Sequence, residues 1–271
     1  MISTGERHYG DSPFRPGLES FLLGGRRGKL LTVVYTAGGE GPHPTVIQLH
    51  GIPGCERNFD VSQALRRNGF NVVTFHYSGS WGSDGDYSLA NDLEDAQTVL
   101  DWALGGAPFR VDREKIFALG HSLGSFVCGQ LAAARREIRA GVLLMPCDIG
   151  RLPRLEAESP SAYKDVVDTL YESAPWHRGT TGEKLYAEAM ANADAFALEG
   201  VAARLADRPL LCIAGSLDSC TPPEFHAEPF VGAVRKAGGS VEYKVYPTDH
   251  AFSDYRLTIA EDVVDFLGGL V

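Results

Sequence analysis

The feature that most constrains the fold is the repeated alternation of short apolar runs with amphipathic helical patterns. The runs are continuously apolar, which is typical of strands that are buried on both faces. Such strands belong to a mostly parallel sheet that helices cover on both sides. The predicted strands span 20–24, 30–36, 45–50, 71–76, 115–119, 140–145, 210–214 and 241–246, and helices are predicted at 59–68, 89–104, 125–135, 223–237 and 256–267.

We therefore predict an α/β fold with a mostly parallel eight-stranded sheet and helices on both faces. The turn-forming run Gly25-Arg26-Arg27-Gly28 separates the first two strands and predicts a hairpin. This hairpin would give the sheet an antiparallel edge. The polar, glycine- and proline-rich residues before about Leu18 are predicted to form an irregular arm.

One interval interrupts the alternation. Between Pro146 and Asp207 no strand pattern occurs, although helical patterns cover 163–172 and 182–193. The interval is too long for a plain crossover, so we predict a helical insertion over the C-terminal edge of the sheet. The predicted domains are a core at 1–146 and 207–271 and a cap at 147–206. Because binding sites are commonly apolar, we expect the active site to be lined by at least one of the cap aromatics Tyr163, Tyr171, Trp176, Tyr186 and Phe196.

The segment Gly120-His121-Ser122-Leu123-Gly124 joins a predicted strand to a predicted helix. A Gly-x-Ser-x-Gly sequence in that setting is typical of a nucleophile elbow, a sharp turn that exposes its serine. A side chain at either glycine would collide with the crossing strand and helix. A serine hydroxyl is a poor nucleophile at neutral pH and needs a base, which in turn needs an orienting carboxylate.

An acid and a histidine stand at suitable places further along the chain. Asp218 and His250 each lie in the loop that follows a predicted apolar strand. Because loops converge at the C-terminal edge of such a sheet, these residues are expected to meet Ser122 there. The order Ser122, Asp218, His250 is the order of a triad on this type of sheet. Asp148, in the loop after an earlier strand, is the alternative acid, and Asp218 is preferred for its Gly-x-x-Asp setting.

With these residues the chain resembles the α/β-hydrolase superfamily over about 18–271, and within it the serine aminopeptidase-like and dienelactone-hydrolase-like branch of small esterases and acyl hydrolases. The resemblance rests on the motifs His50-Gly51-Ile52-Pro53-Gly54, Ser80-Trp81-Gly82-Ser83-Asp84-Gly85, Gly120-His121-Ser122-Leu123-Gly124, Gly215-Ser216-Leu217-Asp218 and Asp249-His250. It implies an α/β-hydrolase fold in which Ser122 is the nucleophile, His250 the general base and acid, and Asp218 the residue that orients His250. It also implies a cap after the sixth strand.

Two backbone amides are expected to form an oxyanion hole. One belongs to Leu123, directly after the candidate nucleophile at the start of a helix, where the helix dipole favours negative charge. The other is expected in the loop after the strand at 45–50, where its position indicates Ile52. Pro53 lacks an N–H and cannot donate.

Four residues in these motifs are expected to have structural or supporting roles. His121 is expected to pack or to hydrogen-bond beneath the nucleophile, and His50 is expected to support the oxyanion loop. Asp249 is expected to be solvated or to support the site indirectly. Trp81 either packs against the core or borders the pocket. Structural or exposed positions are expected for His76, His177 and His226.

The five cysteines are scattered and form no Cys-x-x-Cys pair, so no metal site is expected. Cys128 and Cys212 lie in apolar runs and are expected to be buried. Cys55 and Cys220 lie near the predicted site loops, and no feature marks either as reactive.

Charge narrows the range of partners. The chain has 25 Lys and Arg against 35 Asp and Glu, a formal net charge of −10. Neither nucleic acid nor an anionic membrane is expected as a partner, because both bind basic surfaces. No run approaches the ~18 apolar residues of a membrane span, and the N-terminus lacks an apolar signal region. A cytoplasmic location is therefore expected.

Together these observations predict a serine hydrolase that cleaves a carboxylic ester or a related acyl compound through an acyl-enzyme on Ser122. It would need no metal or organic cofactor, and its partner would be a small-molecule acyl substrate; its oligomeric state is left open. The main alternative is a serine peptidase or amidase with the same triad. A transferase and a non-catalytic binding protein on the same scaffold are further alternatives. Candidates to hold a substrate amine in a peptidase are Glu156, Glu158, Glu172 and Glu183.

Overall fold

The predicted eight-stranded, mostly parallel sheet is confirmed in a computed structural model of the chain, which describes residues 8–271. The first seven residues of the predicted N-terminal arm lie outside the described residues. The strands are β1 (Gly17–Gly25), β2 (Gly28–Thr36), β3 (His43–Leu49), β4 (Asn71–Phe75), β5 (Val111–His121), β6 (Ile138–Leu144), β7 (Leu210–Gly215) and β8 (Val241–Tyr246). Their order across the sheet is β1-β2-β4-β3-β5-β6-β7-β8.

The hairpin of β1 and β2 supplies the antiparallel edge, as the sequence predicts. β2 pairs antiparallel with both β1 and β4, whereas β4, β3, β5, β6, β7 and β8 pair in parallel. The central strand β4 is buried along its whole length, as is β7. Burial on both faces explains why β7 is apolar throughout and why β4 is apolar except for Asn71 and Thr74, whose side chains are hydrogen-bonded.

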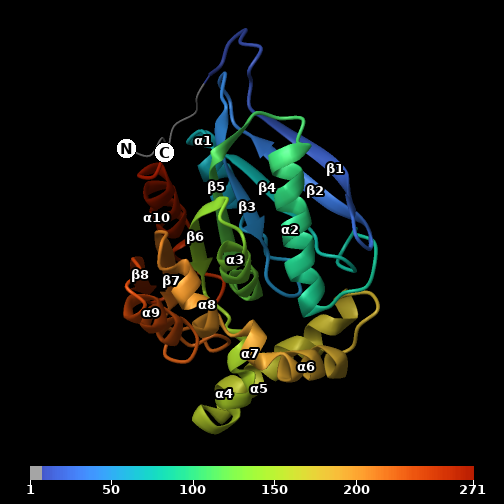
Figure 1. Cartoon of the computed structure of the whole chain (residues 1–271), viewed down its shortest axis with the longest axis vertical. Coiled ribbons are helices and arrows are strands. Elements are labelled where there is room, and N and C mark those ends of the chain that lie inside the picture. Colours follow the sequence, from blue (N-terminus) through green and yellow to red (C-terminus); the bar gives the residue numbers. More distant parts are fainter. Residues whose placement is uncertain (1–7) are drawn as a thin grey trace.

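Helices cover the two faces of the sheet and form two apolar clusters (Figure 1). On one face, α1 (Phe59–Arg67) packs against α10 (Arg256–Gly268) through apolar residues such as Val61 and Ile259. The other face carries α2 (Leu89–Gly105), α3 (Leu123–Ala134) and α9 (Ala227–Lys236). The parallel strands therefore all run toward one edge, beyond which their connecting loops gather.

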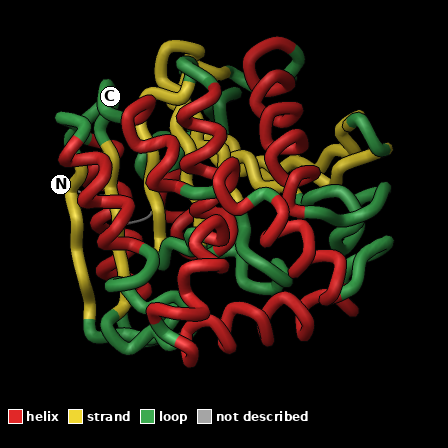
Figure 2. The backbone as a smooth tube through the Cα atoms, turned by 60° about the horizontal axis from the view of Figure 1, so that its bottom comes forward, coloured by secondary structure: helices red, strands yellow, loops and turns green. Residues whose placement is uncertain are grey.

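The interval after β6 is helical, and the two helices predicted there are present. It contains the short 3₁₀ turns Ile149–Arg151 and Ala174–Trp176 and the helices α4 (Leu152–Glu158), α5 (Pro160–Ser173), α6 (Gly182–Ala191), α7 (Ala193–Phe196) and α8 (Leu198–Leu205). Helices α4, α5 and α6 lie together at the lower end of Figure 1, and Figure 2 brings that end forward. By contrast, α8 packs between α3 and α9. The boundaries of the cap stay a prediction.

Two contacts fasten this interval to the sheet's loops. An isolated β-bridge joins Ser80, in the loop after β4, to His177. The carboxylate of Glu188 in α6 accepts hydrogen bonds from the N–H groups of Leu89 and Ala90, both 2.9 Å, at the first turn of α2. A carboxylate is favoured there because the N–H groups of a first helical turn have no partner within the helix.

None of the helices within residues 8–271 is both long and apolar enough to cross a membrane.

Candidate active site

Ser122 occupies the sharp turn between β5 and α3. Its backbone has φ 56° and ψ −126°, a conformation that a residue with a side chain rarely adopts. Such a conformation costs about 1–3 kcal/mol and persists only where the surrounding structure enforces it. Helix α3 begins at Leu123, two residues earlier than the sequence pattern indicates. Ser122 is therefore the residue immediately before the helix, as expected of a nucleophile elbow.

The two glycines of the motif are explained by close backbone contacts. A Cβ atom on Gly120 would collide with the backbone of Gly124, and one on Gly124 would collide with the backbone of Leu49 in β3. The hydroxyl of Ser125 ties the turn together, because it hydrogen-bonds to the carbonyls of Gly120 (2.9 Å) and Leu144 (3.0 Å). The sequence pattern did not single out Ser125; the only signal for it was a serine directly after the second glycine of the motif.

Asp218 and His250 meet at the C-terminal edge of the sheet. The Nδ1 atom of His250 lies 2.7 Å from the Oδ2 atom of Asp218. The carboxylate side chain is 0% exposed, whereas 30% of the imidazole remains exposed. The histidine thus has one nitrogen held by a buried acid and a ring that reaches the surface, which is the arrangement a general base requires.

Thr221 holds the Asp218 carboxylate, and sequence reasoning missed this role. Its hydroxyl donates to Oδ2 of Asp218 (2.7 Å), while Oδ1 accepts the N–H groups of Cys220 (2.9 Å) and Thr221 (3.0 Å). Burial raises the pKa of Asp218, but these bonds and that to His250 outweigh it and bring the pKa below its ordinary value. Asp218 is therefore held as a carboxylate at neutral pH.

His121 positions the loop that carries His250. Its Nε2–H donates to the backbone carbonyl of His250 (3.0 Å), and the two rings lie 5.2 Å apart. Burial, aided by the nearby His250, lowers the pKa of His121 to about 3, so His121 is neutral. The hydroxyl of Ser122 makes no hydrogen bond to any of residues 8–271. It is therefore free to engage a substrate, and the hydrogen bonds of catalytic groups often form only when substrate is bound.

The loop after β3 lies directly against Ser122. A Cβ atom on Gly51 would stand 2.9 Å from Cβ and 3.3 Å from Oγ of Ser122, so only glycine allows this approach. The next residue is Ile52. Within the described chain, neither the Ile52 N–H nor the Leu123 N–H has a hydrogen-bond partner. Two unpaired N–H groups on the segments that flank the serine are suited to stabilise an oxyanion.

His50 supports this loop, as the sequence suggests. Its Nδ1–H donates to the carbonyl of Gly51 (2.7 Å), and its ring packs on Tyr77 at 4.6 Å. The Tyr77 hydroxyl in turn donates to the His50 carbonyl (3.3 Å). Burial lowers the pKa of His50 well below its ordinary value, so this support is neutral.

Asp148, the alternative acid, lies in the loop after β6 and contacts Leu198 and His226. It is fully buried at the end of β6, where Oδ1 accepts the Leu198 N–H (3.1 Å) and its own N–H donates to Nδ1 of His226 (3.1 Å). Its Oδ2 atom is buried without a partner in the described residues. Burial raises the pKa of Asp148 to about 7, even though the bond from Leu198 lowers it. Asp148 thus links the loop after β6 to the start of α8, while Asp218 contacts His250.

Replacement of Asp148 by asparagine tests whether burial raises the pKa of this carboxyl group, because a raised pKa changes how the free energy of unfolding depends on pH. The folded-state pKa is raised, so the unfolded chain loses the Asp148 proton near pH 4 while the folded chain keeps it to about pH 7. The carboxyl therefore destabilises the wild type increasingly as pH rises across that range. We expect Asp148→Asn to gain about 2–3 kcal/mol of unfolding free energy relative to wild type between pH 5 and pH 8. Denaturant unfolding of both proteins at the two pH values measures this, and parallel pH dependences would contradict it.

Asp249 and the five cysteines lie outside the contact between Asp218 and His250. Asp249 is exposed and accepts bonds from the N–H and hydroxyl of Ser253 (2.9 and 2.8 Å). All five cysteines are free, with Cys128 and Cys212 buried as predicted and Cys55 exposed. Burial raises the pKa of Cys220 to about 11, which disfavours a reactive thiolate. Residues 8–271 contain no cluster of three or more histidine, cysteine, aspartate or glutamate residues placed to bind a metal ion.

Comparison with known sequences identifies a family. The sequence profile described as "Alpha/beta hydrolase family" matches residues 47–268 of this chain. A lysophosphatidylserine lipase, ABHD12 of Gallus gallus, is 33% identical over 92 residues, which are 33% of this chain and 23% of that protein. The match to this relative therefore spans about a quarter of its length.

Comparison with solved structures shows the same fold at low sequence identity. Est1E from Butyrivibrio proteoclasticus, solved with ferulic acid bound, has a TM-score of 0.65 and 21% identity, covering 88% of this chain and 94% of that one. The acylaminoacyl peptidase of Pyrococcus horikoshii has a TM-score of 0.70 and 17% identity, covering 94% of this chain and 41% of that one.

Proposed function

The chain belongs to the alpha/beta hydrolase family, and from that premise we propose that it hydrolyses a carboxylic ester, or a related small acyl compound, through an acyl-enzyme on Ser122. The observation that carries the proposal is the 2.7 Å contact between His250 and the buried Asp218 at the sheet edge where the strained Ser122 turn also lies. No other described histidine combines a buried carboxylate partner with a partly exposed ring at that edge.

In the proposed reaction, His250 accepts the Ser122 proton as Oγ attacks the substrate carbonyl carbon. The negative charge that forms on the carbonyl oxygen is stabilised by the N–H groups of Ile52 and Leu123. The Asp218 carboxylate stabilises the protonated imidazole. His250 then protonates the leaving alcohol, which departs and leaves an acyl group on Oγ. Water attacks this acyl-enzyme with His250 again as base, which releases the acid and restores Ser122.

An ester is proposed rather than a peptide because none of the candidate amine-binding acids of the cap offers a carboxylate that is both unpaired and partly buried. Glu158 pairs with Arg151 at 2.6 Å, and Glu199 also contacts that arginine. Glu156, Glu172 and Glu183 are exposed on their helices. A terminal amine would need a fixed, partly buried negative charge to be recognised against water.

The substrate class is tested by comparing short p-nitrophenyl esters with aminoacyl p-nitroanilides on the purified protein. We expect the esters to be turned over with a kcat/KM at least about tenfold above that of any anilide, which corresponds to about 1.4 kcal/mol of transition-state stabilisation. Faster hydrolysis of the anilides would favour the peptidase alternative and contradict the proposal. The matched control is Ser122→Ala, in which turnover of both substrate classes is expected to disappear.

A further inference from the structure

Two tryptophans stand half-exposed where the helical interval meets the oxyanion loop. Trp81 follows β4 and Trp176 follows α5, and their rings stack with centroids 5.4 Å apart and planes inclined by 29°. Trp81 remains 45% exposed and Trp176 56% exposed. Two adjacent indoles that each leave about half of their surface in water form an apolar surface that the fold itself does not cover.

Trp81 is held in place at a cost to the local backbone. Its φ is 51°, a left-handed conformation that is uncommon for a residue with a large side chain. The indole Nε1–H donates to the carbonyl of Pro53 (2.7 Å), the residue that follows Ile52 in the oxyanion loop. This bond fixes an indole that is otherwise open to solvent. Strain at an exposed aromatic beside a candidate active site indicates a functional constraint.

Trp176 is fixed from the other side by its neighbour His177. The His177 ring stacks on Tyr87 at 3.9 Å and its Nδ1 atom lies 2.9 Å from the hydroxyl of Ser80. The backbone bridge between Ser80 and His177 places the residues that follow and precede them, Trp81 and Trp176, next to each other. Both rings are therefore organised before any ligand arrives, which lowers the entropy that binding must overcome.

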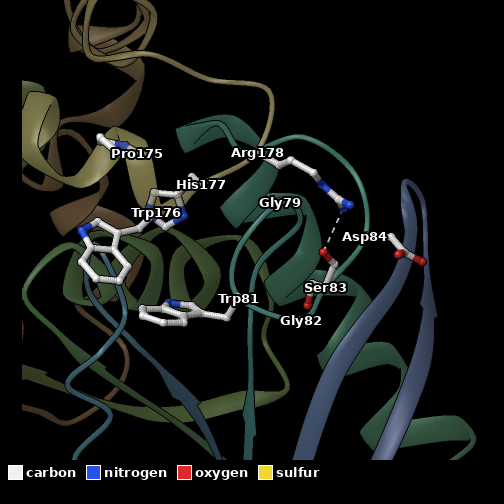
Figure 3. Close-up of a pocket in the computed structure, with 9 residues that line it drawn as sticks. All are labelled: Gly79, Trp81, Gly82, Ser83, Asp84, Pro175, Trp176, His177 and Arg178. Atoms are coloured by element: carbon white, nitrogen blue, oxygen red, sulfur yellow. Dashed lines mark hydrogen bonds between the residues drawn. The ribbon is translucent and has the colours of Figure 1, made fainter.

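A cavity of about 510 Å³ opens beside the pair. Figure 3 shows the two indole rings at one end and Arg178 with Asp84 at the other. The guanidinium of Arg178 is already engaged with the carbonyls of Ser83 (3.0 Å) and Gly85 (3.1 Å). The volume lies in the range of small-molecule sites. The apolar end is thus aromatic, while the polar end is occupied by internal hydrogen bonds.

We propose that Trp81, Trp176 and the adjoining cavity form a subsite for an aromatic ring carried by the ester substrate, a proposal that rests on the proposed ester hydrolysis. Flat aromatic rings gain an offset-stacking attraction on indole faces that saturated rings of the same size lack. The Trp81 indole hydrogen-bonds the carbonyl of Pro53, which directly follows Ile52, so the subsite adjoins the loop whose Gly51 packs against Ser122. Both tryptophans are therefore specificity residues in the proposal and take no part in bond making.

The test uses pairs of uncharged esters that differ only in whether a ring is aromatic. Methyl 3-phenylpropanoate against methyl 3-cyclohexylpropanoate places the ring in the acyl part, and benzyl acetate against cyclohexylmethyl acetate places it in the alcohol. We expect wild type to prefer the aromatic member of one pair by about fivefold or more in kcat/KM, which also shows which part of the ester carries the ring. Equal rates within both pairs would overturn the proposal.

Substitution of Trp176 shows whether the indole is responsible. Trp176→Leu is expected to abolish the aromatic preference in kcat/KM, mainly through KM for the aromatic esters. Trp176→Phe, which keeps an aromatic face, is expected to retain most of the preference. A uniform loss of activity on all esters would instead indicate that the pair only fastens the helical interval, and would overturn the subsite. Trp102→Phe is the matched control, because Trp102 packs on Phe21 (5.2 Å) and Phe109 (5.7 Å) away from the cavity.

A binding measurement separates failure of the subsite from failure of the proposed function. Titration calorimetry of Ser122→Ala with 3-phenylpropanamide, 3-cyclohexylpropanamide, benzyl alcohol and cyclohexylmethanol needs no catalysis. We expect one aromatic ligand to bind at least about fivefold more tightly than its saturated counterpart, and Trp176→Leu in the same background to remove the difference. Aromatic preference in binding without ester turnover would contradict the proposed function alone, whereas turnover with no aromatic preference in binding would contradict the subsite alone.

Discussion

Replacement of Ser122 by alanine is expected to lower kcat for ester hydrolysis by at least about 10⁴-fold, because it removes the atom that forms the acyl-enzyme. The fold should be retained. A methyl group fits where the hydroxyl stands, since that hydroxyl makes no hydrogen bond to the described residues. Initial rates at saturating ester measure the effect.

A fluorophosphonate probe gives an independent measurement of the same prediction. The probe phosphonylates an activated serine and should label wild type and not Ser122→Ala. The matched control is Ser20→Ala, since Ser20 is exposed on the edge strand β1, away from the Ser122 turn. Labelling of Ser20→Ala but not Ser122→Ala is the expected pattern. Wild-type protein that neither reacts with the probe nor turns over an ester would support the non-catalytic alternative.

The second large effect is expected at the acid. Asp218→Asn should reduce kcat by about 10⁴-fold, because an amide that directs its N–H at His250 Nδ1 favours the wrong imidazole tautomer. The backbone N–H groups of Cys220 and Thr221 can still bond the asparagine oxygen, so the loop is expected to stay folded. Steady-state kinetics, with circular dichroism to verify folding, measure the change.

Asp148→Asn is the matched control for this prediction. Both acids follow a parallel strand, and both are almost fully buried. Asp148, however, bonds the Leu198 N–H and contacts His226 rather than His250. Its substitution is expected to change kcat less than about threefold. Loss of activity in Asp148→Asn with retention in Asp218→Asn would reverse the assignment.

Much of the fold could be predicted from the sequence, because its strands and turns depend on residues that are close together in the chain. The continuous apolar runs predict strands buried on both faces, and β4 and β7 are indeed buried throughout. Gly120 and Gly124 mark a turn in which the backbone itself would obstruct a side chain. The loops that hold Asp218 and His250 could be placed at one sheet edge because parallel strands all end there.

The contacts that complete the site could not be predicted in the same way. Thr221 holds Asp218, and His121 bonds the His250 carbonyl across 129 positions of sequence. Neither residue belongs to a pattern that distinguishes it from other threonines or histidines in loops. Such contacts depend on how separate loops fold against one another.

By itself the sequence determined the strand–turn–helix that presents Ser122, and the order in which an acid and a histidine follow it, because each depends on residues adjacent in the chain. Only the tertiary structure showed which of the two candidate acids contacts His250: Oδ2 of Asp218 lies 2.7 Å from Nδ1 of His250, whereas Asp148 bonds Leu198 and His226. It also showed that Trp81 and Trp176 stack beside the loop that follows β3. The physical reason is that side-chain contacts between distant segments depend on the path of the chain in space.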